Sequence, residues 1–84
     1  MKNTYEQLEQ LLMTCPIEGS HWRHYKTKRC YKVIGAAIEE DRLIALVVYQ
    51  PTECPTVSFS RPLHEWEELV EDEEGHSVRR FTRL

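Results

Sequence analysis

Hydrophobic positions near the amino terminus recur at the spacing of an α-helix, with charged and amide side chains between them. These positions are Tyr5, Leu8, Leu11 and Leu12. Thr4 and Gln7 match a capping box, in which the side chain of each residue bonds to the backbone N–H of the other. Pro16 ends the pattern, because its ring removes a backbone donor and disfavours helix at the preceding residue. The sequence predicts one amphipathic helix over residues 4–13, followed by a connector over residues 17–20.

A different pattern begins at residue 30. Residues 30–38 alternate two sets of small and β-branched side chains, and residues 43–50 are almost wholly apolar. Such segments favour β-strands with substantial burial. The polar group at 39–42 predicts that the two strands pair as an antiparallel hairpin, with the second strand central in the sheet. Gly35 inside the first strand predicts a bulge or a sharp bend.

Prolines divide the chain after this hairpin. Residues 51–55 begin and end with proline and break the sheet, and residues 57–61 alternate as a half-exposed strand. Pro62 predicts a turn that holds one helical turn through Trp66. Tyr25 and its neighbours supply one further short strand.

The carboxyl-terminal residues predict a last hairpin, with arms at residues 68–71 and 77–84. Strict alternation along the second arm would place Val78 and Phe81 on opposite faces of the strand. A bulge near residues 79–80 is therefore needed to bury both side chains.

These elements indicate a mainly β protein. About five short antiparallel strands, a glycine kink and little helix after residue 13 predict a small, strongly bent barrel, because closure hides strand edges that would otherwise be exposed. We expect residues 1–20 to form a helix and connector, and residues 21–84 to form the barrel domain. The helix can pack across an open barrel end or hold a second subunit, and we prefer the first. A monomer or a weak homodimer is expected.

The composition is that of an ordinary small globular domain. The chain has 84 residues, 40% of them hydrophobic and 30% charged, with a formal net charge of -3. A domain of this size buries only about 60% of the surface of its unfolded chain, so the core is thin. No apolar segment approaches the ~18 residues that a membrane span needs, and the amino terminus lacks a signal-peptide pattern. We expect a cytoplasmic protein with no membrane association, and its three cysteines, which form no CxxC pair, are expected to be reduced thiols.

Charge is distributed unevenly along the chain. Basic side chains crowd residues 23–32, and acidic side chains crowd residues 65–74. The pattern predicts either a dipolar surface or direct pairing between the two segments. The overall acidity argues against a nucleic-acid-binding protein.

Several separated motifs together resemble a bacterial family called domain of unknown function 1653. The motifs are RHYK at 23–26, YKV at 31–33 followed by Gly35, VVY at 47–49, RPL at 61–63, and Gly75 followed by Val78 and RF at 80–81. Members of that family carry an RHYKG start, a VVY strand, a W-x-RP turn and a V-P-R-F close. The resemblance covers residues 22–84 and implies an SH3-like β-barrel roll, with no established activity.

This chain departs from the family pattern at four positions. Thr27 stands in place of a glycine, Phe59 in place of a tryptophan, Trp66 in place of a phenylalanine and Arg79 in place of a proline. The helix before residue 20 lies outside the resemblance and is expected to be an extension particular to this chain.

Arginine and aromatic side chains at strand ends form the leading candidate binding site. The candidate residues are Trp22, Arg23, His24, Tyr25, Tyr49 and Arg61. Arginine offers a rigid fork of donors to a carboxylate or phosphate, and aromatic rings add stacking or cation–π attraction. We therefore expect a non-enzymatic binding module whose partner is an unknown protein or an anionic small molecule. The alternative is structural: the arginines pair with the acidic segment, and the tyrosines are core residues.

Other chemistries have less support in the sequence. The histidines and cysteines lack the paired spacing of a metal site, so neither a metal nor a cofactor is expected. Cys30 lies among cations that would favour its thiolate, but no base is placed beside it by the sequence. Two alternative functions stay open: a small enzyme or accessory subunit that uses His24, and a single-stranded nucleic-acid adaptor with a basic stripe over residues 23–32.

Overall fold

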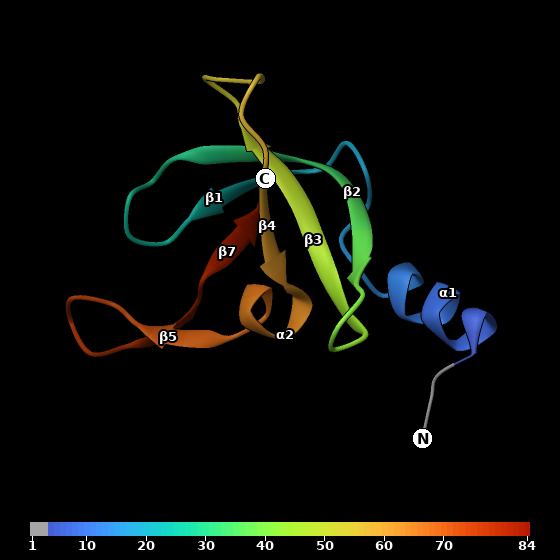
Figure 1. The fold of residues 1–84 in the computed structure, drawn as a ribbon. Helices are drawn as coiled ribbons and strands as arrows, with labels where there is room; N and C mark the ends of the chain where they lie inside the picture. The colour runs from blue at the N-terminus through green and yellow to red at the C-terminus, as the bar shows by residue number, and fades with distance from the viewer. Residues whose placement is uncertain (1–3) are drawn as a thin grey trace.

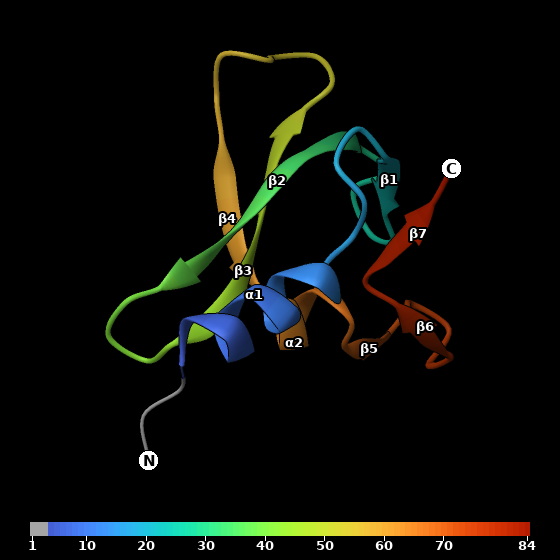
Figure 2. The ribbon, with the colours of Figure 1, turned by 90° about the vertical axis from the view of Figure 1, so that its right-hand side faces the viewer.

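The amino-terminal helix has the predicted boundaries and cap. The structure is a computed structural model that describes residues 4–84. Helix α1 spans Tyr5–Met13, and Thr4 caps it. The Thr4 backbone N–H donates to Gln7 Oε1 at 2.8 Å, and the Gln7 N–H donates to Thr4 Oγ1 at 3.2 Å, which confirms the capping box. The helix contacts the hairpin formed by β2, Cys30–Glu39, and β3, Ile44–Pro51 (Figure 2), yet it buries no residue fully.

Five strands form one antiparallel sheet in the order β4-β3-β2-β1-β7, which confirms a mainly β fold with an amino-terminal helix (Figure 1). The strands are β1 His21–His24, β2 Cys30–Glu39, β3 Ile44–Pro51, β4 Phe59–Pro62 and β7 Phe81–Arg83. Across residues 4–84, no strand pairing links the outer edges of β4 and β7. The sheet is therefore open in its hydrogen bonding, with the last strand beside the first.

The hairpin of β2 and β3 contains the predicted bulge. Val33 pairs with Tyr49, whereas the next pair along the ladder is Gly35 with Val48, so Ile34 is the extra residue. A bulge bends the strand that carries it and increases its twist. Figure 1 shows β2 curving along the neighbouring β3, which lies between β2 and β4 as expected for the most apolar segment.

Two predicted strand boundaries change in the structure, and the predicted helical turn is confirmed. Strand β1 ends at His24, so Tyr25 lies in the following turn rather than in the strand. Strand β4 begins at Phe59 instead of Val57. The predicted single helical turn is present as α2, Leu63–Trp66.

The predicted last hairpin is divided at Arg80. Strand β5, Leu69–Glu71, pairs with β6, Ser77–Arg79, in a separate two-stranded sheet, and the chain then enters β7 beside β1. The Arg80 backbone N–H donates to the Glu68 carbonyl at 3.3 Å, and the Arg80 carbonyl accepts from Tyr25 N–H at 2.9 Å. The irregularity lies at the predicted residues 79–80, but it is a break between β6 and β7, Phe81–Arg83, and not a bulge within one strand. It lets Phe81 become buried while Val78 stays half-buried.

Aromatic rings dominate the core. Its buried members are Val33, Val47, Tyr49, Trp66 and Phe81, with Trp22, Tyr31 and Leu63 packed around them. Phe81 stacks on Trp66 with centroids 3.9 Å apart and planes inclined by 10°. This pair joins α2 to β7, so it ties the helical turn to the sheet.

Candidate functional site

Strand β1 places two neighbouring candidate residues on opposite faces of the sheet. Arg23 is exposed and lies opposite Thr82 of β7. His24 is half-buried, and the centroid of its ring lies 5.3 Å from that of Phe81 in an edge-on contact. Alternation along the strand thus sends the guanidinium outward and the imidazole toward the core.

His24 also organises the turn between β1 and β2. Its Nδ1 accepts hydrogen bonds from the backbone N–H groups of Lys26 at 3.2 Å and Thr27 at 3.3 Å. In the neutral ring the proton therefore sits on Nε2. The left-handed residue of the turn is Lys28, with φ 63°, so Thr27 needs no glycine-like conformation here.

The surroundings of His24 favour its neutral form. Burial lowers the pKa of the imidazole, and the positive charges of Arg80, Arg61 and Lys26 lower the pKa further. A protonated His24 would add a fourth positive charge to this group. An anion bound nearby would oppose that shift, because it favours the charged ring.

Arg23, His24 and Tyr25 line one cleft of about 290 Å³ between β1, β6 and β7, which we call the basic cleft. The other lining residues are Lys28, Asp72, Val78, Arg79, Thr82 and Leu84. Within residues 4–84, Arg23, Lys28 and Arg79 form no ion pair. Three cations around a tyrosine ring can receive a carboxylate or phosphate without first losing a protein carboxylate.

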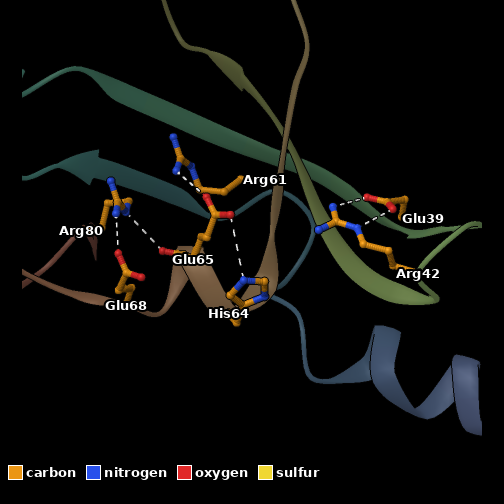
Figure 3. A network of polar contacts seen from close by, with 7 residues as sticks. All are labelled: Glu39, Arg42, Arg61, His64, Glu65, Glu68 and Arg80. Atoms are coloured by element: carbon orange, nitrogen blue, oxygen red, sulfur yellow. Dashed lines mark hydrogen bonds and ion pairs between the residues drawn. The ribbon is translucent and has the colours of Figure 1, made fainter.

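Arg61 and Tyr49 form a different group. The Arg61 Nη1 donates to Glu65 Oε1 at 3.3 Å, and its Nε lies 3.5 Å from the Tyr49 hydroxyl (Figure 3). The Arg61 guanidinium carbon lies 5.9 Å from the Phe81 ring centroid, within cation–π range. Tyr49 is a buried core residue, and neither residue lines the basic cleft.

Arg80 is held in the same way as Arg61. Its Nη2 donates to Glu68 Oε1 at 2.7 Å, and its Nε donates to the Glu65 carbonyl at 3.2 Å. Figure 3 shows Glu65 between the side chains of Arg61 and Arg80. The structural alternative, in which the candidate arginines pair with the acidic segment, therefore holds for Arg61. Arg80, which was not a candidate residue, pairs with the same segment.

Trp22 belongs to the packing around the core. Its Nε1 donates to Ser20 Oγ at 2.8 Å, and its ring meets Trp66 edge-on at 5.5 Å. It lines a cavity beside the connector rather than the basic cleft. The basic cleft thus gathers three of the six candidate residues, Arg23, His24 and Tyr25.

Sequence reasoning missed two lining cations. Lys28 lies in the basic segment that the charge pattern identified, and Arg79 occupies a position where the family usually has proline. Both signals were present, but only pairing across the β1–β7 edge brings Arg79 near Arg23. The departure at Arg79 therefore adds a charge to the candidate site.

Other features of the described chain limit the chemistry. No group of three or more histidine, cysteine or acidic side chains suited to a metal ion occurs among residues 4–84. Cys15, Cys30 and Cys54 are free, and burial beside Glu67 raises the pKa of the Cys15 thiol. No helix in the described part of the chain is long and apolar enough to cross a membrane.

Comparison with known proteins identifies the family and no close relative of known activity. Neither a curated protein nor a solved structure gives a significant match to the chain. The model of the family described as "Protein of unknown function (DUF1653)" matches residues 20–83, which include strands β1 to β7 and every residue that lines the basic cleft except Leu84. The chain belongs to this family of unknown function.

Proposed function

We propose that the chain is a non-enzymatic binding module that receives the anionic group of a small molecule or peptide in the basic cleft. In this proposal residues 21–84 form an SH3-like roll, and residues 1–20 are an accessory helix and connector. The strand order supports the roll, since β7 returns beside β1.

One observation carries the proposal: Arg23, Lys28 and Arg79 line one cleft together with Tyr25, and these three cations form no ion pair with the rest of residues 4–84. The Nε2–H of His24 is directed by the bonds at Nδ1 and makes no side-chain hydrogen bond within the described chain. The site thus offers several donors to one acceptor. A carboxylate or phosphate fits this chemistry, because charge-assisted bonds to guanidinium are strong and directional.

The test is a titration followed by backbone amide NMR, with acetate and inorganic phosphate as probes at low ionic strength. Saturable shifts should concentrate on residues 23–28 and 78–82, and Arg23→Ala should weaken binding by about tenfold, the equivalent of one charged contact. Arg83→Ala is the matched control, because Arg83 lies on β7 but lines the cavity beside the connector, together with Trp22, instead of the basic cleft. If both variants lost the same affinity, the binding would depend on the net charge of the chain and not on the basic cleft.

A short single-stranded oligonucleotide serves as a second probe. If it bound far more tightly than phosphate, with an affinity that fell steeply with salt, the nucleic-acid adaptor would replace the present proposal.

A further inference from the structure

A second cleft adjoins the basic cleft and has the opposite charge. It has a volume of about 360 Å³ and lies between the β1–β2 turn and the β5–β6 hairpin. Figure 1 shows these two loops on the same side of the molecule. Its lining residues are Tyr25, Lys26, Lys28, Glu71, Asp72, Glu73 and Glu74. Carboxylates outnumber ammonium groups here, so we call it the acidic cleft.

The two clefts share part of their lining. Tyr25, Lys28 and Asp72 line both of them. From one cleft to the next, the lining changes from carboxylate-rich, through the shared Tyr25, to arginine-rich. Combined volumes of this order reach the ~300–1,000 Å³ range of small-molecule sites.

The charges that face each other across the acidic cleft are not neutralised by each other. Lys26 and Lys28 form no ion pair with Glu71 or Glu73 in the part of the chain that is described. The sequence predicted either a dipolar surface or direct pairing of these segments, and at this point the structure has the dipolar arrangement.

One of the four carboxylates already has a structural role, and another lies near a histidine. Asp72 Oδ1 accepts from the backbone N–H groups of Glu74 and His76, each at 2.9 Å, which fixes the hairpin loop. Glu74 Oε2 lies 3.7 Å from His76 Nδ1. Glu71 and Glu73 keep their carboxylates available for a cation.

We infer that the two clefts form one groove for an elongated zwitterion, such as an amino acid or short peptide that carries an ammonium group and a carboxylate several bonds apart. The ammonium group lies against Glu71 and Glu73, the alkyl chain crosses the Tyr25 ring, and the carboxylate meets Arg23 and Arg79. This assignment rests on the proposed function, since it uses the basic cleft for the anionic end. It adds the cationic end and the order of the two charges.

The test compares three probes of similar length by calorimetry and amide NMR on the full chain at low ionic strength. The probes are 6-aminohexanoate, hexanoate and hexylamine. We expect 6-aminohexanoate to bind about tenfold more tightly than hexanoate, because it adds one charged contact. Its shifts should cover residues 71–74 as well as 23–28, whereas those of hexanoate should stay near Arg23.

The double variant Glu71→Gln/Glu73→Gln should lower the affinity for 6-aminohexanoate to that for hexanoate and leave hexanoate binding intact. Glu6→Gln/Glu9→Gln is the matched control, because it makes the same change of net charge on the exposed side of α1. This control should retain the preference for 6-aminohexanoate.

Two contrary outcomes are distinguishable. Equal affinities for 6-aminohexanoate and hexanoate, or a preference that survives Glu71→Gln/Glu73→Gln, would overturn the zwitterion assignment and leave the basic cleft as an anion site. Absence of hexanoate binding at every concentration tested would overturn the proposed function itself.

Discussion

Arg61 and Arg80 differ from Arg23 and Arg79 in what their guanidinium groups contact. Arg61 donates to Glu65 and lies over the Phe81 ring, and Arg80 donates to Glu68 and to the Glu65 carbonyl. Arg23 and Arg79 line the basic cleft without an ion pair within residues 4–84. An anion that approached Arg61 would have to displace a carboxylate. At Arg23 it would displace only water, so the same residue type stabilises the fold at one place and is available to a ligand at the other.

The largest effect on the free energy of unfolding should come from the aromatic core beside Arg61. Phe81→Ala removes the stacked partner of Trp66 and should lower the free energy of unfolding by about 3–5 kcal/mol, the usual cost of deleting a buried phenylalanine. Urea denaturation followed by tryptophan fluorescence measures the change. Phe59→Ala is the control, because this ring is 44% exposed and should cost about 1 kcal/mol. Equal losses would mean that the aromatic cluster is not the centre of stability.

A smaller effect should separate the two classes of arginine. Arg61→Ala should lower the free energy of unfolding by about 1 kcal/mol, because a half-exposed ion pair and a contact with Phe81 are lost. Arg79→Ala should change it by no more than about 0.5 kcal/mol, as is usual for exposed positions. The same denaturation curves, with acetate binding measured in parallel, check both. If Arg79→Ala lost as much stability as Arg61→Ala, Arg79 would have a structural role as well, and the two classes of arginine would not differ.

The smallest effect on stability should come from His24, which lines the basic cleft and lies near the charges of Arg61 and Arg80. Its lowered pKa means that the unfolded chain binds the proton more tightly, so His24 reduces stability as the pH falls below about 6.5, the ordinary value for histidine. Thermal melts across this pH range should show a decline that is shallower in His24→Asn. His21→Asn, an exposed position on the same strand, should keep the decline of the parent chain. An unchanged slope in His24→Asn would assign the decline to other groups.

Local chemistry made much of the fold predictable. The capping box, the bulge at Gly35 and the helical turn after Pro62 each depend on residues close together in sequence, and each is present. The end of β1 at His24 was missed because it depends on hydrogen bonds that the His24 ring accepts from backbone N–H groups of the following turn.

The candidate site was less predictable, because ion pairing is a tertiary property. Arg23 and Arg61 both have aromatic residues nearby in the sequence, and Arg61 also has Glu65 four residues later. That spacing was visible, but its meaning depended on the turn at Leu63–Trp66 being helical. The pairing of β7 with β1, which brings Arg79 to Arg23, has no local signal.

Side-chain NMR of the arginine Nε–H groups tests the central claim most directly. As acetate is added to the full chain, the Nε signals of Arg23 and Arg79 should shift and saturate together. Those of Arg61 and Arg80 should stay in place, because the Tyr49 hydroxyl and the Glu65 carbonyl already accept from these two Nε–H groups. Shifts at Arg61 and Arg80 with none at Arg23 and Arg79 would contradict the account.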